Sequence, residues 1–225
     1  HGLTTPRVME RSVSVDGTTK YALGFEDARV ETVLIPARAR STVCISSQAG
    51  CTRRCTFCAT KDLGFTRHLK AEEMVAQFLV ARAEAPARQP ATNVVFMGMG
   101  EPMDNLDEVL QAVEVLTQTP APQLRAEAVT VSTSGVVPGM RRFLAESRAS
   151  LALSLNATTD AVREQLMPHT KTWPIAALLD VLREAATRDP RRVTFIEYVL
   201  FDGVNDTDAD ADRLVAMLRA LPARV

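Results

Sequence analysis

The chain of 225 residues is 46% hydrophobic and 24% charged, which is ordinary for a globular protein with a buried core. No apolar run approaches the ~18 residues that a membrane helix needs, and no secretory signal opens the chain. The composition therefore excludes a membrane-spanning helix, and we expect a cytoplasmic protein with no membrane partner.

The formal net charge of −1 hides an uneven distribution. Between Arg38 and Lys70 the chain has seven basic residues and a single acid, Asp62, so the remainder is acidic by seven (−1 minus +6). A basic stretch of this kind suits a polyanionic partner or a negatively charged cofactor. It fits a solvated loop face equally well.

Residues 11–35 alternate apolar and polar side chains around Asp16-Gly17. Asp-Gly between two alternating segments is typical of a β-hairpin. We therefore expect residues 1–40 to form a small antiparallel β element that leads into a main domain at residues 41–225.

After Ser41, short apolar strands alternate with amphipathic helices. Strands are predicted at 42–46, 93–98, 128–135, 151–155 and 192–200. Apolar stripes at helical spacing lie at Leu106, Val109, Leu110 and Val113, at Ile175, Leu178, Leu179 and Leu182, and at Leu214, Met217, Leu218 and Leu221. Asp104 or Asn105 is the expected cap of the first of these helices. The alternation predicts an α/β fold with a parallel sheet or barrel and right-handed crossovers.

In such folds the functional groups gather at the carboxyl ends of the strands. The residues just past the predicted strands are small, polar or flexible, and they comprise the segments 47–58, 98–102, 132–135, 154–156 and 203–206. One rim of the sheet is therefore expected to carry all the candidate site residues.

All four cysteines lie in one window, spaced Cys44-x6-Cys51-x3-Cys55-x2-Cys58. Disulfides would cross-link only this short segment, because no cysteine lies outside this window. The last three cysteines are also too close together to form the two separate ligand pairs of a structural zinc site. The C-x3-C-x2-C loop after a strand instead favours an iron–sulfur cluster, since thiolates are its usual ligands. Three ligands leave one iron of a four-iron cluster open.

This spacing, with Phe57 before the last cysteine, resembles the signature of the radical S-adenosylmethionine (SAM) enzymes. The resemblance implies that Cys51, Cys55 and Cys58 hold a 4Fe–4S cluster, and that the amino and carboxylate groups of SAM chelate the open iron. One electron from the cluster would then split the sulfonium bond and give a 5′-deoxyadenosyl radical.

Polar residues of the predicted rim agree with a SAM site. The segment 98–102 is similar to the "GGEP" region of the superfamily, which implies that Gly100 and Glu101 receive the SAM amino group, as a carboxylate suits an ammonium. Taken singly, Glu101 also fits a helix cap. The resemblance places further contacts to SAM at the ends of the third and fourth strands, at Ser132, Ser154, Leu155 and Asn156.

Longer segments are similar to one family, the RlmN/Cfr adenine methyltransferases. They are "CISSQAGCTRRCTFCAT", "NVVFMGMGEPMDN", "VTVSTSGVVPGM" and "LALSLNATTDAVREQLMP", and the resemblance covers nearly all of residues 14–225. It implies a partial (β/α)6 TIM-like barrel of the radical SAM type. "STSG" and "GEP" are more similar to the members that methylate carbon 2 of adenine than to those that methylate carbon 8.

The resemblance also implies a reaction in two stages. SAM first methylates a cysteine near the carboxyl terminus, and the radical made from a second SAM then removes hydrogen from that methyl group, so that the carbon adds to carbon 2 of the adenine. Glu31 would take the ring proton, and Cys44 would form a disulfide with the other sulfur and release the RNA. Without the family, Glu31 fits an exposed strand carboxylate and Cys44 a small buried strand residue.

The implied substrate is one adenine of 23S rRNA and an adenine beside the anticodon of some tRNAs. We further expect an electron donor such as flavodoxin and a monomeric protein. Two departures from the family stand out, because no cysteine follows Cys58 and Asn156 stands where many members have histidine. We therefore expect a chain truncated at both ends, without the last barrel strand and the carboxyl-terminal tail, which would begin near Val225.

Two alternatives stay open at this point. One is a radical SAM enzyme of the same scaffold that acts on adenine carbon 8 or on a non-RNA substrate. The other is a non-catalytic iron–sulfur or zinc module that binds RNA. Iron content and reductive cleavage of SAM distinguish an enzyme from such a module.

Overall fold

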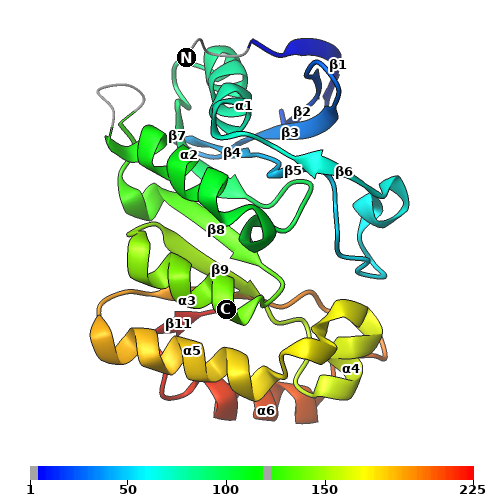
Figure 1. Ribbon diagram of the computed structural model, residues 1–225, viewed down its shortest axis with the longest axis vertical. Coiled ribbons are helices and arrows are strands. Elements are labelled where there is room, and N and C mark those ends of the chain that lie inside the picture. The colour runs from blue at the N-terminus through cyan, green and yellow to red at the C-terminus, as the bar shows by residue number, and fades with distance from the viewer. Residues whose placement is uncertain (1–4, 119–122) are drawn as a thin grey trace.

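The computed structural model describes residues 5–118 and 123–225. Within these residues the main feature is a nine-stranded sheet in the order β1-β2-β3-β4-β7-β8-β9-β10-β11 (Figure 1). Two further strands, β5 (Gln48–Gly50) and β6 (Phe65–His68), pair antiparallel in a second sheet. Helices pack along one face of the large sheet. The fold is therefore α/β, as the sequence predicts.

The first three strands confirm the predicted antiparallel element. β1 (Arg7–Val13) and β2 (Thr19–Gly24) are joined by a turn in which the Asp16 carboxylate accepts hydrogen bonds from the backbone N–H and the hydroxyl of Thr18, both at 3.0 Å. β3 (Arg29–Pro36) pairs antiparallel with β2 and with β4 (Ser41–Cys44). The element thus extends the main sheet at one edge instead of forming a sheet of its own.

From β4 onward the strands of the large sheet run parallel. They are β7 (Ala91–Phe96), β8 (Val129–Thr133), β9 (Ser150–Ser154), β10 (Thr194–Glu197) and β11 (Ala223–Arg224). The five strands predicted after Ser41 are confirmed, although β8 and β10 are shorter than predicted and β4, β7 and β9 begin one or two residues earlier. A last strand was expected to be missing from this chain, whereas the structure has a strand of two residues, β11, paired with β10. These parallel strands and their helices form the partial (β/α)6 barrel.

The helices follow the strands in turn. Their bounds are α1 (Ala71–Glu84), α2 (Leu106–Gln118), α3 (Val137–Glu146), α4 (Asp160–Leu166), α5 (Ile175–Arg188) and α6 (Asp208–Leu218). α1 packs on α2, α2 on α3 and α3 on α5. The stripes predicted on α2 and α5 lie in the core, whereas α6 ends at Leu218, before the last residue of its predicted stripe, and its apolar residues are only partly buried.

Alternation along the strands sorts core residues from candidate site residues. Val43 of β4, Val94 of β7 and Val131 of β8 are fully buried, on the face that the helices cover. Because neighbouring side chains point to opposite faces, the residues of the other parity face the inside of the partial barrel. Four of these end or nearly end their strands, namely Cys44, Ser132, Ser154 and Glu197.

The predicted cap of α2 is wrong. Residues Pro102–Asn105 form a 3-10 turn that leads into α2, and Asp104 and Asn105 both bind other segments. The Asn105 amide donates to the carbonyls of Ser47 (2.9 Å) and Leu69 (2.7 Å). A long-range contact thus takes the side chain that local propensity assigns to the helix end.

Gln77 of α1 fixes the segment that enters the cysteine loop. Its side chain is fully buried, and its Oε1 accepts from the Ser46 N–H (2.8 Å) and the Thr32 hydroxyl (2.9 Å). Its Nε2 donates to the Ser46 carbonyl at 3.0 Å. The side-chain amide of Gln77 therefore forms hydrogen bonds with both backbone groups of Ser46, two residues after the end of β4.

Replacement of Gln77 by Met should lower the free energy of unfolding by about 2–4 kcal/mol, because buried groups of Ser46 and Thr32 lose their partners. Urea unfolding followed by circular dichroism measures the change. Gln111→Met on the exposed face of α2 is the matched control and should change stability by less than about 0.5 kcal/mol. Equal stability of the two variants would contradict this assignment.

Candidate functional site

A cavity of about 410 Å³ opens at the carboxyl edge of the parallel strands, within the ~300–1,000 Å³ range of ligand pockets. Eight of the eleven residues that the sequence predicts for the site line it, namely Cys51, Cys55, Cys58, Gly100, Glu101, Ser132, Ser154 and Asn156. They come from four separate loops or strand ends. The predicted common rim is therefore confirmed for these residues.

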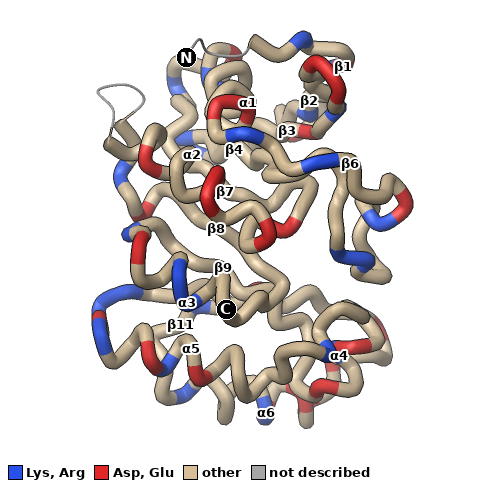
Figure 2. Tube along the Cα trace, viewed as in Figure 1, with Lys and Arg blue, Asp and Glu red and all other residues tan. Residues whose placement is uncertain are grey.

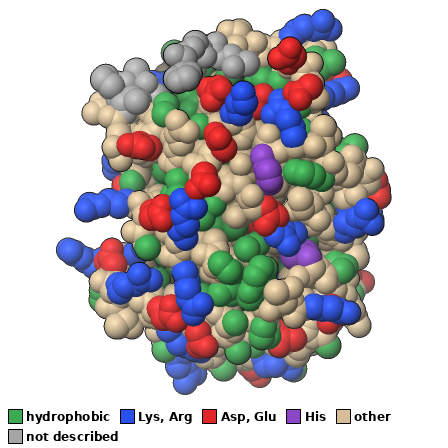
Figure 3. All heavy atoms as spheres, viewed as in Figure 1, with side chains coloured by type: hydrophobic (Ala, Val, Ile, Leu, Met, Phe, Trp, Pro, Cys, Tyr) green, Lys and Arg blue, Asp and Glu red, His purple; other side chains and the backbone are tan. Residues whose placement is uncertain are grey.

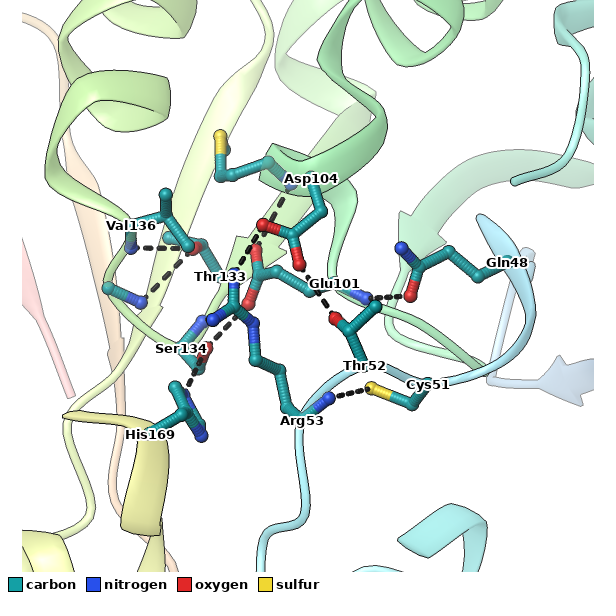
Figure 4. A network of polar contacts seen from close by, with 12 residues as sticks. Gln48, Cys51, Thr52, Arg53, Glu101, Asp104, Thr133, Ser134, Val136 and His169 are labelled. Carbon is teal, nitrogen blue, oxygen red and sulfur yellow. Dashed lines mark hydrogen bonds and ion pairs between the residues drawn. The ribbon is translucent and has the colours of Figure 1, made fainter. Parts of the chain in front are cut away.

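The loop of the three cysteines is fastened at two points. Thr52 donates to Asp104 Oδ2 at 2.7 Å, and the Arg53 guanidinium forms an ion pair with the same carboxylate (Figure 4). Further along, the Thr56 N–H donates to the Leu166 carbonyl at 2.9 Å. Asp104, which the sequence suggests as a helix cap, thus holds the cysteine loop against the segment that follows β7.

The donor set of this loop fits an iron–sulfur cluster. All four cysteines are free thiols, and burial raises the pKa of Cys55 to about 12, with the neighbouring Cys58 and Cys51 as the next causes. Three thiols that repel one another as thiolates call for a bound cation. Among the described residues no three His, Cys, Asp or Glu side chains converge closely enough to hold a single metal ion.

Glu101 is a buried carboxylate on the wall of the cavity, with 3% of its surface exposed. Oε1 accepts from the Met103 N–H (3.1 Å), and Oε2 accepts from the Ser134 N–H (2.8 Å) and hydroxyl (2.6 Å). No ion pair joins it to a basic side chain in the described part of the chain. Glu101 therefore caps a turn, as one sequence interpretation holds, and also presents uncompensated charge to a cationic ligand.

Gly100 lets this carboxylate approach the loop before the cysteines. Its φ is +106°, and a Cβ at this position would lie 2.6 Å from the Cβ of Gln48. The Gln48 amide oxygen in turn accepts from the Glu101 N–H at 3.0 Å. Only glycine combines this backbone conformation with this close approach.

Ser132 and Ser154 converge on a residue that the sequence analysis did not select. Both hydroxyls donate to Glu197 Oε2, at 3.0 Å and 2.9 Å, and Glu197 also lines the cavity. The strand predicted at 192–200 extends beyond Glu197, where β10 ends in the structure. The prediction therefore placed this carboxylate within the strand and not at its end. The alternation of side chains along that strand could have identified Glu197, because it gives Glu197 the same inward-facing parity as Ser154 of β9.

Leu155 and Asn156 both serve the fold, and of the two only Asn156 lines the cavity. Leu155 is fully buried, and its N–H donates to the Glu197 carbonyl at 3.0 Å. Asn156 has a φ of +57°, which asparagine tolerates better than most residues. Its amide oxygen accepts from the Val199 N–H at 3.0 Å. Contact of either residue with SAM stays a prediction.

Glu31 and Cys44 do not line this cavity. Glu31 is exposed, forms an ion pair with Lys20 at 2.9 Å and lines a second cavity of about 390 Å³. Cys44 is partly buried, and burial raises its pKa to about 11. The segment 98–100 separates the two cavities, because Met99 lines the second and Gly98 and Gly100 line the first.

Arg163 of α4 is a buried cation beneath the rim, with 1% exposure. Its Nη2 donates to the carbonyls of Ser134 (2.6 Å) and Ser154 (3.2 Å), and its Nε donates to that of Leu155 (3.0 Å). Burial lowers its pKa to about 10. One guanidinium thus ties the ends of β8 and β9 together.

His169 extends the network from Glu101. Its Nε2 lies 2.8 Å from the Ser134 hydroxyl (Figure 4), and its Nδ1 is buried without a partner among the described residues. Burial is the largest cause that lowers its pKa to about 4, and the charges of Arg53 and Arg163 act in the same direction. His169 is therefore neutral at physiological pH, with Nε2 as the donor to Ser134.

Two of the seven basic residues between 38 and 70 are already paired. Arg67 of β6 (Phe65–His68) binds Glu73 and Asp27, both at 2.7 Å, and Arg53 binds Asp104. Of the other five, Arg54 lies on the cysteine loop and Lys61 just after it. Figure 2 shows the basic positions along the chain. Acidic and basic side chains are interspersed over the face in Figure 3.

In the described residues no helix has the length and apolar character to cross a bilayer.

A partial barrel whose rim brings three thiols, a buried carboxylate and two serines to one cavity defines a radical SAM fold. The sequence profile of the radical SAM superfamily matches residues 45–215, and the chain belongs to this superfamily. The superfamily's cofactors are a 4Fe–4S cluster and SAM, and the thiols and rim acids described above fit both.

Two relatives indicate which members of the superfamily this chain is similar to. The protein of Syntrophobacter fumaroxidans named dual-specificity RNA methyltransferase RlmN is 42% identical over 219 residues, which are 97% of this chain and 64% of that protein. The protein of the same name from Geobacter sulfurreducens is 44% identical over 98% of this chain and 60% of its own length. This chain thus spans less than two thirds of these relatives.

A solved structure agrees with the sequence comparisons. The crystal structure of a radical SAM methyltransferase from Sphaerobacter thermophilus matches with a TM-score of 0.93 and 39% identity, over 99% of this chain and 66% of that chain. The agreement confirms the predicted radical SAM barrel and the resemblance to the RlmN/Cfr family.

The low pKa of His169 makes stability depend on pH. The unfolded chain, where histidine has a pKa near 6.5, binds more protons than the folded chain between about pH 4 and 6.5. Stability should therefore fall as the pH drops through this range. His169→Gln, which keeps a donor for Ser134, should reduce that fall by on the order of 1–2 kcal/mol, allowing for partial solvent screening.

Urea unfolding at pH 6.5 and at pH 4.5 measures the difference, and a comparison at pH 8 is the control. At pH 8 both proteins have a neutral side chain at this position. An identical fall in stability for the two proteins on acidification would show that His169 does not titrate between the two states.

Proposed function

We propose that the chain forms the catalytic core of an enzyme that methylates carbon 2 of an adenine in 23S rRNA, and in some tRNAs, through a methyl-cysteine intermediate. The observation that carries the proposal is that Cys51, Cys55 and Cys58 line the same cavity as Glu101 and the rim serines. Similarity to proteins named RNA methyltransferases over 97–98% of the chain supports RNA as the substrate class.

The residues of the cavity divide the work of binding the cofactors. Cys51, Cys55 and Cys58 hold the cluster, and Glu101, fixed by Ser134, receives the amino group of SAM. When bound, the two cofactors supply a carbon-centred radical, which can react at an sp² ring carbon that an ordinary displacement does not reach. The loop contacts of Asp104 keep the thiols in place for this binding.

Cys44 and Glu31 act on the substrate side in this proposal. Cys44 pairs with Val33 in the β3–β4 ladder, and Glu31 lies two residues from Val33, so both residues share the inward face of the sheet. Glu31 removes the ring proton, and Cys44 then attacks the sulfur that links the protein to the ring. The S–S bond forms as the S–CH2 bond breaks, and the released carbon takes a proton to become the methyl group of the RNA. A thiol with a pKa near 11 stays protonated at neutral pH, so Cys44 needs a base before it attacks.

The proposed partners follow the same reasoning. We infer a cytoplasmic monomer that receives its electron from a donor such as flavodoxin. The reaction also requires a methyl-accepting cysteine, and the sequence has none after Cys58. Because this chain spans less than two thirds of its relatives, tests of methyl transfer use a protein that covers their full length.

Iron binding tests the cluster assignment. Anaerobic reconstitution should give about four irons per chain in the unchanged protein, because the cavity holds a cubane on three thiols. Cys55→Ala should lose most of this iron, whereas Cys44→Ala, the matched control outside the cavity, should keep it. Iron and sulfide assays measure both, and release of 5′-deoxyadenosine under reduction reports SAM cleavage. Tightly bound zinc without SAM cleavage would contradict the proposal.

The role of Cys44 has a separate test in the full-length protein. Cys44→Ala should accumulate a covalent protein–RNA adduct during turnover, because the thiol that resolves the link is missing. A denaturing gel with labelled RNA detects the adduct, and Cys58→Ala, which should form none, is the control. Adenine methylated at carbon 8, found by mass spectrometry of the digested RNA, would favour the alternative activity.

A further inference from the structure

The loops that lead into the parallel strands form a basic edge opposite the cavity. Each of the loops before β4, β7, β8, β9 and β10 has at least one exposed arginine. These residues, which we call the amino-edge arginines, are Arg38, Arg40, Arg88, Arg125, Arg148 and Arg191. In Figure 2 basic positions recur down the left side of the view, where the parallel strands begin, and Figure 3 shows basic side chains that project from this side.

The amino-edge arginines have no acidic partners. None of their side chains forms an ion pair or a hydrogen bond with residues 5–118 and 123–225. Glu127 and Asp189 are the only acids in the described parts of these loops, and Asp189 accepts from the Arg191 backbone N–H at 3.2 Å. At the carboxyl edge, Arg53 and Arg67 are paired with acids. The positive charge of the amino edge is therefore left for an external anion.

Neighbouring loops act together on such an anion. β4, β7, β8, β9 and β10 are adjacent in the sheet, and adjacent strands lie about 4.8 Å apart. This spacing is less than the Debye length of about 8 Å at physiological salt, so the potentials of neighbouring arginines add. The row of loops extends over on the order of 20 Å across these strands. Its ligand therefore carries repeated negative charge over a comparable length.

The same loops offer charge and no surface for stacking. They comprise residues 37–40, 85–90, 123–128, 147–149 and 189–193, and none of these residues is aromatic. Sequence-specific recognition of RNA relies on bases that stack on aromatic rings, whereas a guanidinium binds a phosphate through two parallel hydrogen bonds. The amino edge thus suits a phosphate backbone of any sequence.

We propose that the amino-edge arginines bind the phosphate backbone of the RNA substrate at a distance from the methylated adenine, an inference that rests on the proposed RNA substrate. The parallel strands from β4 to β10 are four to six residues long. At about 3.3 Å per residue, the amino edge lies on the order of 13–20 Å from the cavity. A folded RNA that reaches both edges gains affinity at the first while its adenine occupies the second. The arginines therefore act on binding and not on the chemistry.

The salt dependence of RNA binding tests the proposal. Filter binding measures the affinity of this chain for an unmodified 23S rRNA transcript between about 50 and 200 mM salt. Arg88, Arg148 and Arg191 are replaced together by Gln. Each lost phosphate contact lowers the slope of log K against log salt by about 0.7–0.9. The triple variant should therefore lower the slope by about 2–3 and bind about 10- to 100-fold more weakly at about 0.1 M salt.

The matched control removes three exposed arginines that already have acidic partners. It replaces Arg141, Arg142 and Arg183 by Gln, so both variants lose the same formal charge. The control should change the slope by less than about 0.5. Equal effects in the two variants would overturn the proposal, because they indicate a general loss of charge, and so would an unaltered slope in the first variant. The unfolding midpoint of each variant confirms that it is folded.

Two further measurements separate the other outcomes. Polyglutamate that displaces the transcript as effectively as unlabelled RNA would identify an acidic protein segment as the ligand and overturn the assignment to RNA. In a protein that covers the full length of the relatives, the first triple variant should raise KM for the transcript by about 10-fold or more with kcat unchanged, and a loss in kcat alone would contradict the proposal. Failure of the unchanged full-length protein to methylate the transcript would overturn the proposed function, whereas the binding measurements decide the role of the amino edge.

Discussion

The geometry of the site depends on the buried guanidinium of Arg163. A cation with 1% exposure costs stability unless its donors are satisfied, and three backbone carbonyls at the ends of β8 and β9 satisfy them. These carbonyls belong to the segments that carry Ser132, Ser154 and Asn156. The burial of one charge therefore fixes the spacing of two strand ends, and with it the wall of the cavity.

The charged groups around the cavity are only partly paired with one another. Arg53 is neutralised by Asp104, and Arg163 is bound to carbonyls. Burial lowers the pKa of Arg163, and the charges of Asp160 and Glu101 act in the opposite direction. Glu101 and Glu197 are left as acids without a basic partner in the described residues. This excess of carboxylate oxygens makes the cavity complementary to a cationic ligand.

The sequence predicted the parts of the fold that short-range patterns encode. Apolar strands that end in glycine and serine located the rim, and the cysteine spacing located the cluster loop. It could not predict contacts between loops far apart in the chain, such as Asp104 with Thr52 and Arg53, since no local signal distinguishes a helix cap from a loop anchor. α1 shows no clear stripe because neighbours bury most of its circumference, including Met74, Val75 and Phe78.

The turn at 98–100 is the boundary between the cofactor cavity and the second cavity. Gly98 and Gly100 line the first, whereas Met99 lines the second together with Glu31. The same turn carries Gly100 towards Gln48 and ends next to Glu101. The backbone that positions the buried carboxylate therefore also closes one side of its cavity. Cys44 lines neither cavity, but its pKa near 11 reflects burial first and then the charge of Glu197, which lies in the wall of the first. A thiol in this setting stays protonated and reacts slowly until a base approaches it.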